Sequence, residues 1–198
     1  MVPGEFISWI SNPSCVSFPW TMIDKITPRP DDEIRNLLAR DGIEDLDIRS
    51  GVSGSVTAPF VNAEECEYLV VEEAFPAGRP PLEKAGVLFT SRRTVERAER
   101  MKVCTCLNPL HTALAIYGCL LGFRRISEEM EDSALRRLAL SVGFQEGMPV
   151  VCDPGILHPE QFLREAVSLR ISNPYLPDTP WRIATDTSQK LSVRFGET

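Results

Sequence analysis

The twenty residues CTCLNPLHTALAIYGCLLGF, numbered 104–123, contain no Asp, Glu, Lys or Arg. Asn108, Pro109 and His111 interrupt the first third of this stretch, and the apolar run after them is too short to cross a bilayer. We therefore expect a buried core helix here. A buried amide or imidazole costs free energy unless it is hydrogen-bonded, so Asn108 and His111 need a structural or a chemical use.

The residues around Asn108 indicate a break between two helices. A residue before proline avoids the α region and proline favours the first helical turn, which predicts a helix that starts here with Asn108 as its cap. On one continuous helix Lys102 and His111 would face opposite sides, so a kink is needed to bring them together. From spacing alone, a capping asparagine, a hydrogen-bonded core histidine and a solvated lysine are the simpler interpretation.

The rest of the chain predicts a mainly α fold of the α+β class: a helical bundle with a small antiparallel β hairpin or sheet. A proline-rich connector precedes a helix that Asp31 or Asp32 caps and that runs to about Arg40. Short β-rich runs follow between about residues 55 and 90, broken by PAGRPP. Helical periodicity then predicts helices over 91–103, 109–121, 126–142 and 159–171.

The domain organisation is expected to be incomplete. Residues 1–30 are expected to form a proline-rich connector, followed by one folded domain over residues 31–198. The final residues predict the first turns of another helix, begun by Asp186 with Gln189 in a capping box. We therefore expect the chain to be truncated at its end and to lack a domain before the connector.

The composition and net charge argue against several classes of ligand and partner. A net charge of -7 over 198 residues, with no basic stripe, argues against a nucleic-acid partner. No export signal precedes the connector, so we expect a cytoplasmic protein without a membrane partner.

Two histidines and scattered cysteines predict no metal cofactor. Gly51 and Gly54 lack a third glycine and a following helix, so no dinucleotide cradle is expected in this chain. The oligomeric state stays open.

Four stretches resemble the polyol-specific long-chain dehydrogenases, the family that includes mannitol dehydrogenase and the hexuronate reductases. They are FPWTMIDKITPRP (18–30), GRPPLEKAGVLFT (78–90), MKVCTCLNPLHTALAIYG (101–118) and NPYLPDTPWRIATDTSQKLSVRFGET (173–198). The resemblance runs nearly end to end and is nearest to the fructuronate reductase (D-mannonate oxidoreductase) branch. It implies a helical substrate domain like the C-terminal domain of 6-phosphogluconate dehydrogenase, normally preceded by a Rossmann domain that binds NAD.

The same resemblance implies catalytic roles for Lys102, Asn108 and His111. A lysine accepts a hydroxyl proton if burial and neighbours pull its pKa from about 10.4 toward about 7–8. Amide and imidazole N–H groups stabilise the alkoxide that forms. Five residues separate Lys102 from Asn108, whereas the family more often has four. The resemblance further implies that Asp24, Arg182 and Lys190 bind the substrate, where a cationic pair suits a sugar-acid carboxylate.

The expected function is therefore half of an NAD-dependent oxidoreductase that interconverts D-fructuronate and D-mannonate. Two alternatives remain open. In the first, the enzyme's substrate is tagaturonate or a neutral polyol such as mannitol, because the sequence does not distinguish between these small molecules. Otherwise the chain is a non-catalytic remnant that keeps the fold, because hydride transfer requires a cofactor site that this sequence does not supply.

Overall fold

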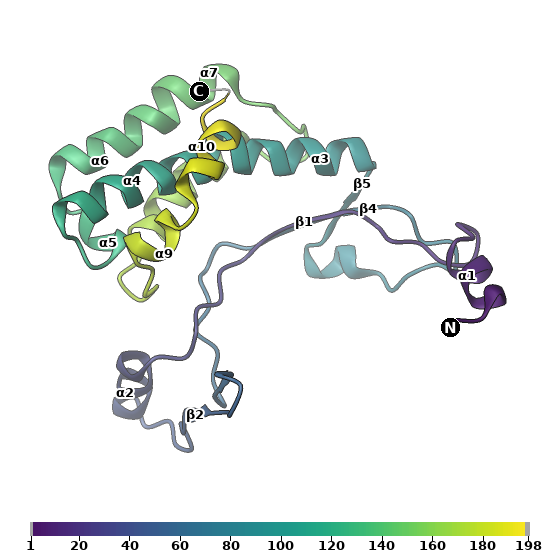
Figure 1. Ribbon diagram of the computed structural model, residues 1–198, viewed down its shortest axis with the longest axis horizontal. Helices are drawn as coiled ribbons and strands as arrows, with labels where there is room; N and C mark the ends of the chain where they lie inside the picture. Colours follow the sequence, from purple (N-terminus) through teal and green to yellow (C-terminus); the bar gives the residue numbers. More distant parts are fainter. Residues whose placement is uncertain (1, 197–198) are drawn as a thin grey trace.

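The computed structural model of the protein describes residues 2–196 and has two contrasting parts. A helical bundle, built from the chain after Ser91, packs its helices side by side (Figure 1). An extended arm, built from the first ninety residues, carries a long two-stranded ribbon away from the bundle to helix α1 (Figure 1). A small lobe with helix α2 and strand β2 hangs from the inner end of this ribbon (Figure 1). The mainly α prediction is confirmed.

The charge-free stretch lies in one long helical run. Helix α3 (Arg92–Met101) continues through the π-helical turn η2 (Lys102–Cys106) into α4 (Asn108–Leu121), which Gly122 ends in the left-handed region at φ 81°. The sequence predicted a break before Asn108, and a π-helical turn takes its place. Leu107, with φ -132°, holds the N-cap position instead of Asn108, whose side chain does not cap the helix.

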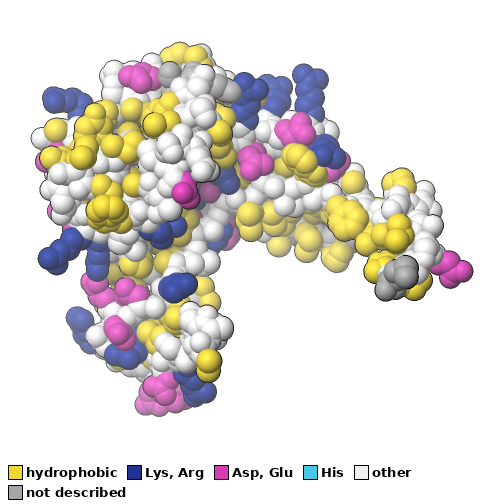
Figure 2. Space-filling model, viewed as in Figure 1, with side chains coloured by type: hydrophobic (Ala, Val, Ile, Leu, Met, Phe, Trp, Pro, Cys, Tyr) yellow, Lys and Arg dark blue, Asp and Glu magenta, His cyan; other side chains and the backbone are white. Residues whose placement is uncertain are grey.

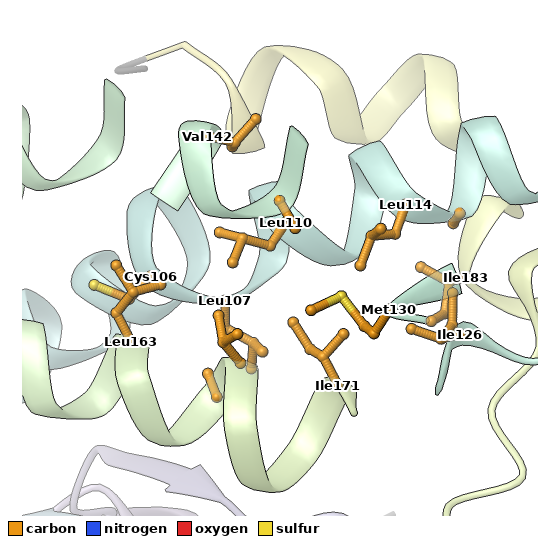
Figure 3. Close-up of a cluster of buried hydrophobic side chains, with 14 of the residues drawn as sticks. Cys106, Leu107, Leu110, Leu114, Ile126, Met130, Val142, Leu163, Ile171 and Ile183 are labelled. Atoms are coloured by element: carbon orange, nitrogen blue, oxygen red, sulfur yellow. The ribbon is translucent and has the colours of Figure 1, made fainter. Parts of the chain in front are cut away.

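Helix α4 is the centre of the core. Leu110, Leu114 and Leu163 are fully buried in a cluster with Ile171 and Met130 (Figure 3). The run Arg92–Leu121 has the length and apolar composition to cross a membrane, but 56% of its most apolar window is buried inside the protein. Burying such side chains contributes roughly 1.5–3 kcal/mol each, so the run packs as the core helix that the sequence predicted.

The remaining helical elements lie either in the bundle, around α4, or in the arm. In the bundle they are α5 (Ile126–Glu129), α6 (Ser133–Leu140), η3 (Ser141–Gly147), α7 (Met148–Val150), α8 (Pro159–Glu165), η4 (Ala166–Ile171), α9 (Pro180–Ala184) and α10 (Thr187–Arg194). In the arm they are α1 (Gly4–Ile10), α2 (Asp32–Arg40) and η1 (Leu82–Ala85). Asp31 caps α2 by accepting from the Ile34 amide at 3.0 Å, as predicted. Asp186 precedes α10 in the left-handed region at φ 57°, so the predicted capping box does not form.

The arm's sheet is mixed rather than purely antiparallel. Strand β1 (Thr21–Asp24), inside the expected connector, pairs antiparallel with β4 (Tyr68–Glu72), and β5 (Leu88–Thr90) pairs with β4 in parallel. A parallel pair needs a crossover of a dozen or more residues, and the segment that holds η1 supplies it. The antiparallel prediction was wrong for β5. A separate antiparallel pair joins β2 (Arg49–Ser50) to β3 (Val56–Thr57).

Candidate active site

The arm is joined to the bundle by a buried ionic cluster around Arg170, on the π-helical turn η4. Its Nη1 donates to Asp24 Oδ1 at 2.9 Å and its Nε donates to Glu64 Oε2 at 2.6 Å, while all three side chains are buried. Glu64 Oε1 in turn accepts from the Ile26 amide at 2.5 Å. These contacts fix the end of β1 against the bundle. Asp24 Oδ2 is buried without a hydrogen-bond partner among the described residues, so this carboxylate retains acceptor capacity.

His111 lies in the first turns of α4 and lines a small cavity beside this cluster. Arg170, Ile26 and Asp178 line the same cavity. Burial lowers the pKa of His111 to about 4; Asp178 opposes the shift, and the charges of Arg170, Arg182 and Arg194 add to it. The imidazole is therefore neutral near pH 7, with one ring N–H to donate and one ring nitrogen to accept. The sequence predicted a polar use for this histidine, and Arg182 in the same site, but neither Arg170 nor Arg194.

A larger pocket of about 390 Å³ adjoins the His111 cavity. Both share Ile26, Leu176 and Asp178 in their walls, and the pocket adds Arg182 together with the chain from Thr27 to Arg29. Asp178 Oδ1 accepts from Arg182 Nε at 2.7 Å and from its Nη2 at 2.5 Å. The guanidinium of Arg182 is thereby held at the pocket wall. A pocket of this volume suits a small polar molecule.

The remaining predicted residues take different positions. Asn108 lies three residues before His111, so both occupy one face of α4. Lys102 Nζ donates to the Ile23 carbonyl at 2.9 Å, one residue before Asp24. Lys190 Nζ donates to the carbonyls of Ile183 and Thr185 at the end of α9, and it lines neither pocket. The structure therefore places His111 and Arg182 on adjoining cavities and links Asp24 to the first of them through Arg170. Lys102 contacts the strand residue before Asp24 and lines neither cavity.

Sequence reasoning missed four charged residues of the site: Arg170, Glu64, Asp178 and Arg194. One signal was available for Arg170. The buried residues Leu163, Ala166, Val167, Arg170 and Ile171 form a helical core stripe, and an arginine in such a stripe needs a buried partner. No periodicity identifies that partner, because Asp24 and Glu64 lie 146 and 106 residues away along the chain.

The Gly51–Gly54 turn does not have the geometry of a dinucleotide cradle. Gly51 and Gly54 lie between β2 and β3, where no helix follows to present its N-terminal amides to a phosphate. The site thus holds groups that can donate and accept hydrogen bonds, while the paired glycines that the sequence offered as a candidate supply no nucleotide cradle.

Half-buried His111 and Asn108 thus lie together at the start of a core helix, next to a pocket lined by Arg182. The mannitol dehydrogenase C-terminal domain matches residues 94–197 of this chain. The chain therefore belongs to the mannitol dehydrogenase family, whose members act as oxidoreductases on CH–OH groups.

Three relatives show the extent of the similarity. D-mannonate oxidoreductase of Thermotoga maritima is 55% identical over 200 aligned positions, which cover 100% of this chain and 36% of that protein. A D-sorbitol dehydrogenase solved in substrate-free form matches with a TM-score of 0.80 at 30% identity, over 98% of this chain and 36% of that one. Mannitol 2-dehydrogenase of Pseudomonas fluorescens, in a ternary complex with NAD and D-mannitol, matches with a TM-score of 0.66 at 30% identity, over 90% and 33%. The chain thus spans about a third of the length of these proteins.

Proposed function

We propose that this chain is the substrate-binding and catalytic domain of an NAD-dependent oxidoreductase that interconverts D-fructuronate and D-mannonate in the cytoplasm. The observation that carries this proposal is the 55% identity to a D-mannonate oxidoreductase along the entire chain. In this division residues 1–30 are the connector and residues 31–198 the substrate domain. The nicotinamide, which accepts or supplies hydride, is bound by a part of the enzyme outside these residues.

His111 and Asn108 stabilise the reacting oxygen. A secondary alcohol that loses its proton passes through alkoxide character, and neutral N–H donors favour that charge without competing for the proton. His111 suits this role because burial and three nearby cations keep it neutral. Asn108 lies on the same face of α4. Removing one such donor typically lowers kcat by on the order of 10²-fold.

Lys102 is the proton acceptor in the oxidative direction. Its position at the first residue of η2 gives a physical reason for the five residues between Lys102 and Asn108. In a π-helical turn each amide bonds to a carbonyl five residues back rather than four, so the turn accommodates one residue more than an α-turn. The hydrogen bond to the Ile23 carbonyl holds the ammonium next to Asp24.

Asp24 and Arg182 bind the hydroxyl groups of the sugar chain. Asp24 has an unpartnered buried oxygen, and Arg182 lines the pocket of about 390 Å³. Lys190 contributes indirectly, because its ammonium binds the carbonyls at the end of α9 and so steadies the helix that carries Arg182. A cation near a helix C-terminus also interacts favourably with the helix dipole.

A neutral polyol is the second candidate substrate. The matches to a sorbitol dehydrogenase and a mannitol 2-dehydrogenase favour it, because both cover at least nine-tenths of this chain. The two candidates differ by one carboxylate, so paired substrates separate them. D-mannonate and D-mannitol have the same arrangement of hydroxyl groups and differ at one terminal carbon.

A chimera tests the proposal. The stretch of the Thermotoga maritima enzyme that aligns with this chain is replaced by residues 1–198, and the rates of NADH-dependent reduction of D-fructuronate, D-tagaturonate and D-fructose are compared. We expect the highest kcat/KM with D-fructuronate. A preference for D-fructose would support the polyol alternative, and a chimera that unfolds cooperatively but reduces none of the three would identify a non-catalytic remnant.

A further inference from the structure

The two cavities of the site meet at one acidic residue. Ile26, Leu176 and Asp178 line both the small His111 cavity and the larger pocket that contains Arg182. Of these three shared side chains, only that of Asp178 is polar. A sugar chain whose reacting oxygen lies at His111 and whose other groups reach Arg182 therefore passes beside the Asp178 carboxylate.

The two oxygens of this carboxylate differ in what they bind. Asp178 Oδ1 lies 2.7 Å from Arg182 Nε and 2.5 Å from its Nη2. Oδ2 makes no hydrogen bond within residues 2–196, although only 13% of the side chain is exposed. A carboxylate can accept about four hydrogen bonds, and largely buried polar oxygens usually have a partner. Oδ2 therefore retains acceptor capacity at the wall that both cavities share.

Asp178 is also held firmly by its backbone. Its carbonyl accepts from the Ile126 amide at 3.0 Å, and its amide donates to the Leu176 carbonyl at 2.7 Å. Thr179, the next residue, caps α9 by accepting from the Arg182 amide at 3.3 Å. The ion pair with Arg182 further restricts the side chain. Such an acceptor loses little conformational entropy when a ligand binds, because it is already ordered.

We infer that Asp178 Oδ2 binds a hydroxyl group of the sugar substrate, between the reacting oxygen at His111 and the groups bound by Arg182. This inference rests on the proposed function and adds a substrate-binding residue to it. A hydroxyl that donates to a carboxylate forms a charge-assisted hydrogen bond, which is stronger than a neutral one. D-mannonate and D-mannitol share their arrangement of hydroxyl groups, so the contact serves either candidate substrate.

Steady-state kinetics of the chimera and of its Asp178→Asn variant test this contact. The amide keeps the size of the side chain but replaces one acceptor oxygen by an NH2 donor. The loss of a charge-assisted hydrogen bond predicts that KM for D-mannonate rises by roughly 10- to 100-fold. The value of kcat should change less, because the contact is present before and during the reaction.

Glu160→Gln is the matched control. Glu160 pairs with Arg164 as Asp178 pairs with Arg182, through Nε at 3.2 Å and Nη2 at 2.6 Å, and it lines neither cavity. This variant loses the same kind of ion pair four residues apart along a helix. It should therefore change neither KM nor kcat.

Substrate analogues distinguish a direct contact from a structural effect. Monodeoxy analogues of D-mannonate each lack one hydroxyl other than the one that is oxidised. If Asp178 binds one of these hydroxyls, the analogue without it has a raised KM in the unmodified chimera, and Asp178→Asn adds little further. The same coupling should persist in an Arg182→Met background, because the ion pair with Arg182 uses the other carboxylate oxygen.

Three outcomes would overturn the inference: an unchanged KM in Asp178→Asn, an increase that is equal for every analogue, or a coupling that disappears in the Arg182→Met background. Asp178→Glu covers the case in which Asp178→Asn does not fold. It keeps the charge and displaces the oxygens by one methylene, so its KM should rise with coupling to one hydroxyl, and the absence of coupling would again count against the inference. Failure of the unmodified chimera to oxidise D-mannonate contradicts the proposed function itself, whereas normal oxidation that Asp178→Asn leaves unchanged contradicts only the role of Asp178.

Discussion

The bundle and the arm differ in how far their large apolar side chains are exposed to solvent. Leu110, Leu114 and Leu163 of the bundle have 0% of their surface exposed, whereas in the arm Phe18 is 72% and Trp9 53% exposed. Figure 2 shows hydrophobic side chains gathered along the surface of the arm. Because burial of apolar surface supplies most of the favourable free energy of folding, stability is concentrated in the bundle. The arm depends on the few places where it contacts the bundle.

A second, small apolar cluster joins the arm to the bundle. Met22, Val70, Val95 and Ala98 form a separate buried cluster, which packs β1 and β4 against α3. Beyond it, the Arg170 cluster is the polar contact that ties Asp24 of the arm to η4, and Arg170 itself lines the His111 cavity. The bundle thus supplies a rigid helix for His111. The arm completes the site with residues from a less stable part of the protein.

The largest expected effect is at Arg170. Arg170→Met leaves Asp24 and Glu64 buried without their cation, and loss of one partner from a buried ionic cluster typically costs about 3–5 kcal/mol. Urea unfolding measures the loss. The matched control is Arg164→Met, whose ion pair with Glu160 is largely exposed and whose loss should cost at most about 1 kcal/mol. Equal effects at the two arginines would show that the cluster does not hold the arm.

The second prediction contrasts the two regions directly. Leu114→Ala opens a cavity in the core of the bundle and should lower the free energy of unfolding by about 2–5 kcal/mol. Trp9→Ala in α1 removes a half-exposed ring and should change it by no more than about 0.5 kcal/mol. Denaturant unfolding of both variants provides the comparison. A larger loss for Trp9→Ala would place more of the stability in the arm than its burial indicates.

The third prediction uses Glu129, a fully buried residue of α5 whose two carboxylate oxygens lack hydrogen-bond partners among the described residues. Burial, and then the neighbouring charge of Glu128, raise the pKa of Glu129 from 4.5 to about 8. Between these values the unfolded chain releases the proton while the folded protein keeps it. The free energy of unfolding should therefore fall with rising pH across this window, by at most about 1.4 kcal/mol per pH unit.

Glu129→Gln should remove that part of the pH dependence. The exposed Glu131→Gln variant is the control, and thermal unfolding between pH 5 and about pH 8 provides the measurement. Gly118 lies so close that an added Cβ would meet Glu129 Oε1 at 1.9 Å, so the carboxyl packs tightly against α4. A pH profile that is the same in Glu129→Gln and in the unmodified protein would show that Glu129 is solvated or paired.

These contrasts also show what the sequence could predict. Local signals sufficed for the core helix and its end at residue 121, and for Asp31 as a cap. They did not suffice for the parallel pairing of β5, because strand direction depends on the whole crossover. Nor did they reveal the π-helical turn, since Asn108 before Pro109 favours a break just as readily.

In the site, too, local sequence patterns predicted some features and not others. The sequence pointed to His111 because a polar group in an apolar helix needs a use. The resemblance of the surrounding stretch to a family then implied a catalytic use. The surroundings that keep it neutral come from Arg170, Arg182 and Arg194, residues that lie far from it along the sequence. Such long-range neighbours follow from how the helices of the bundle pack, which no local pattern encodes.

The most direct test of the account is the protonation of His111. The chain has two histidines, so in a His158→Gln variant a single imidazole remains to be followed by NMR as the pH is lowered. We predict that His111 stays neutral down to about pH 4, because burial and the surrounding cations disfavour the imidazolium. Titration near the ordinary value of about 6.5 would contradict the account, because it would mean that His111 is solvated and that the arm does not close the site around it.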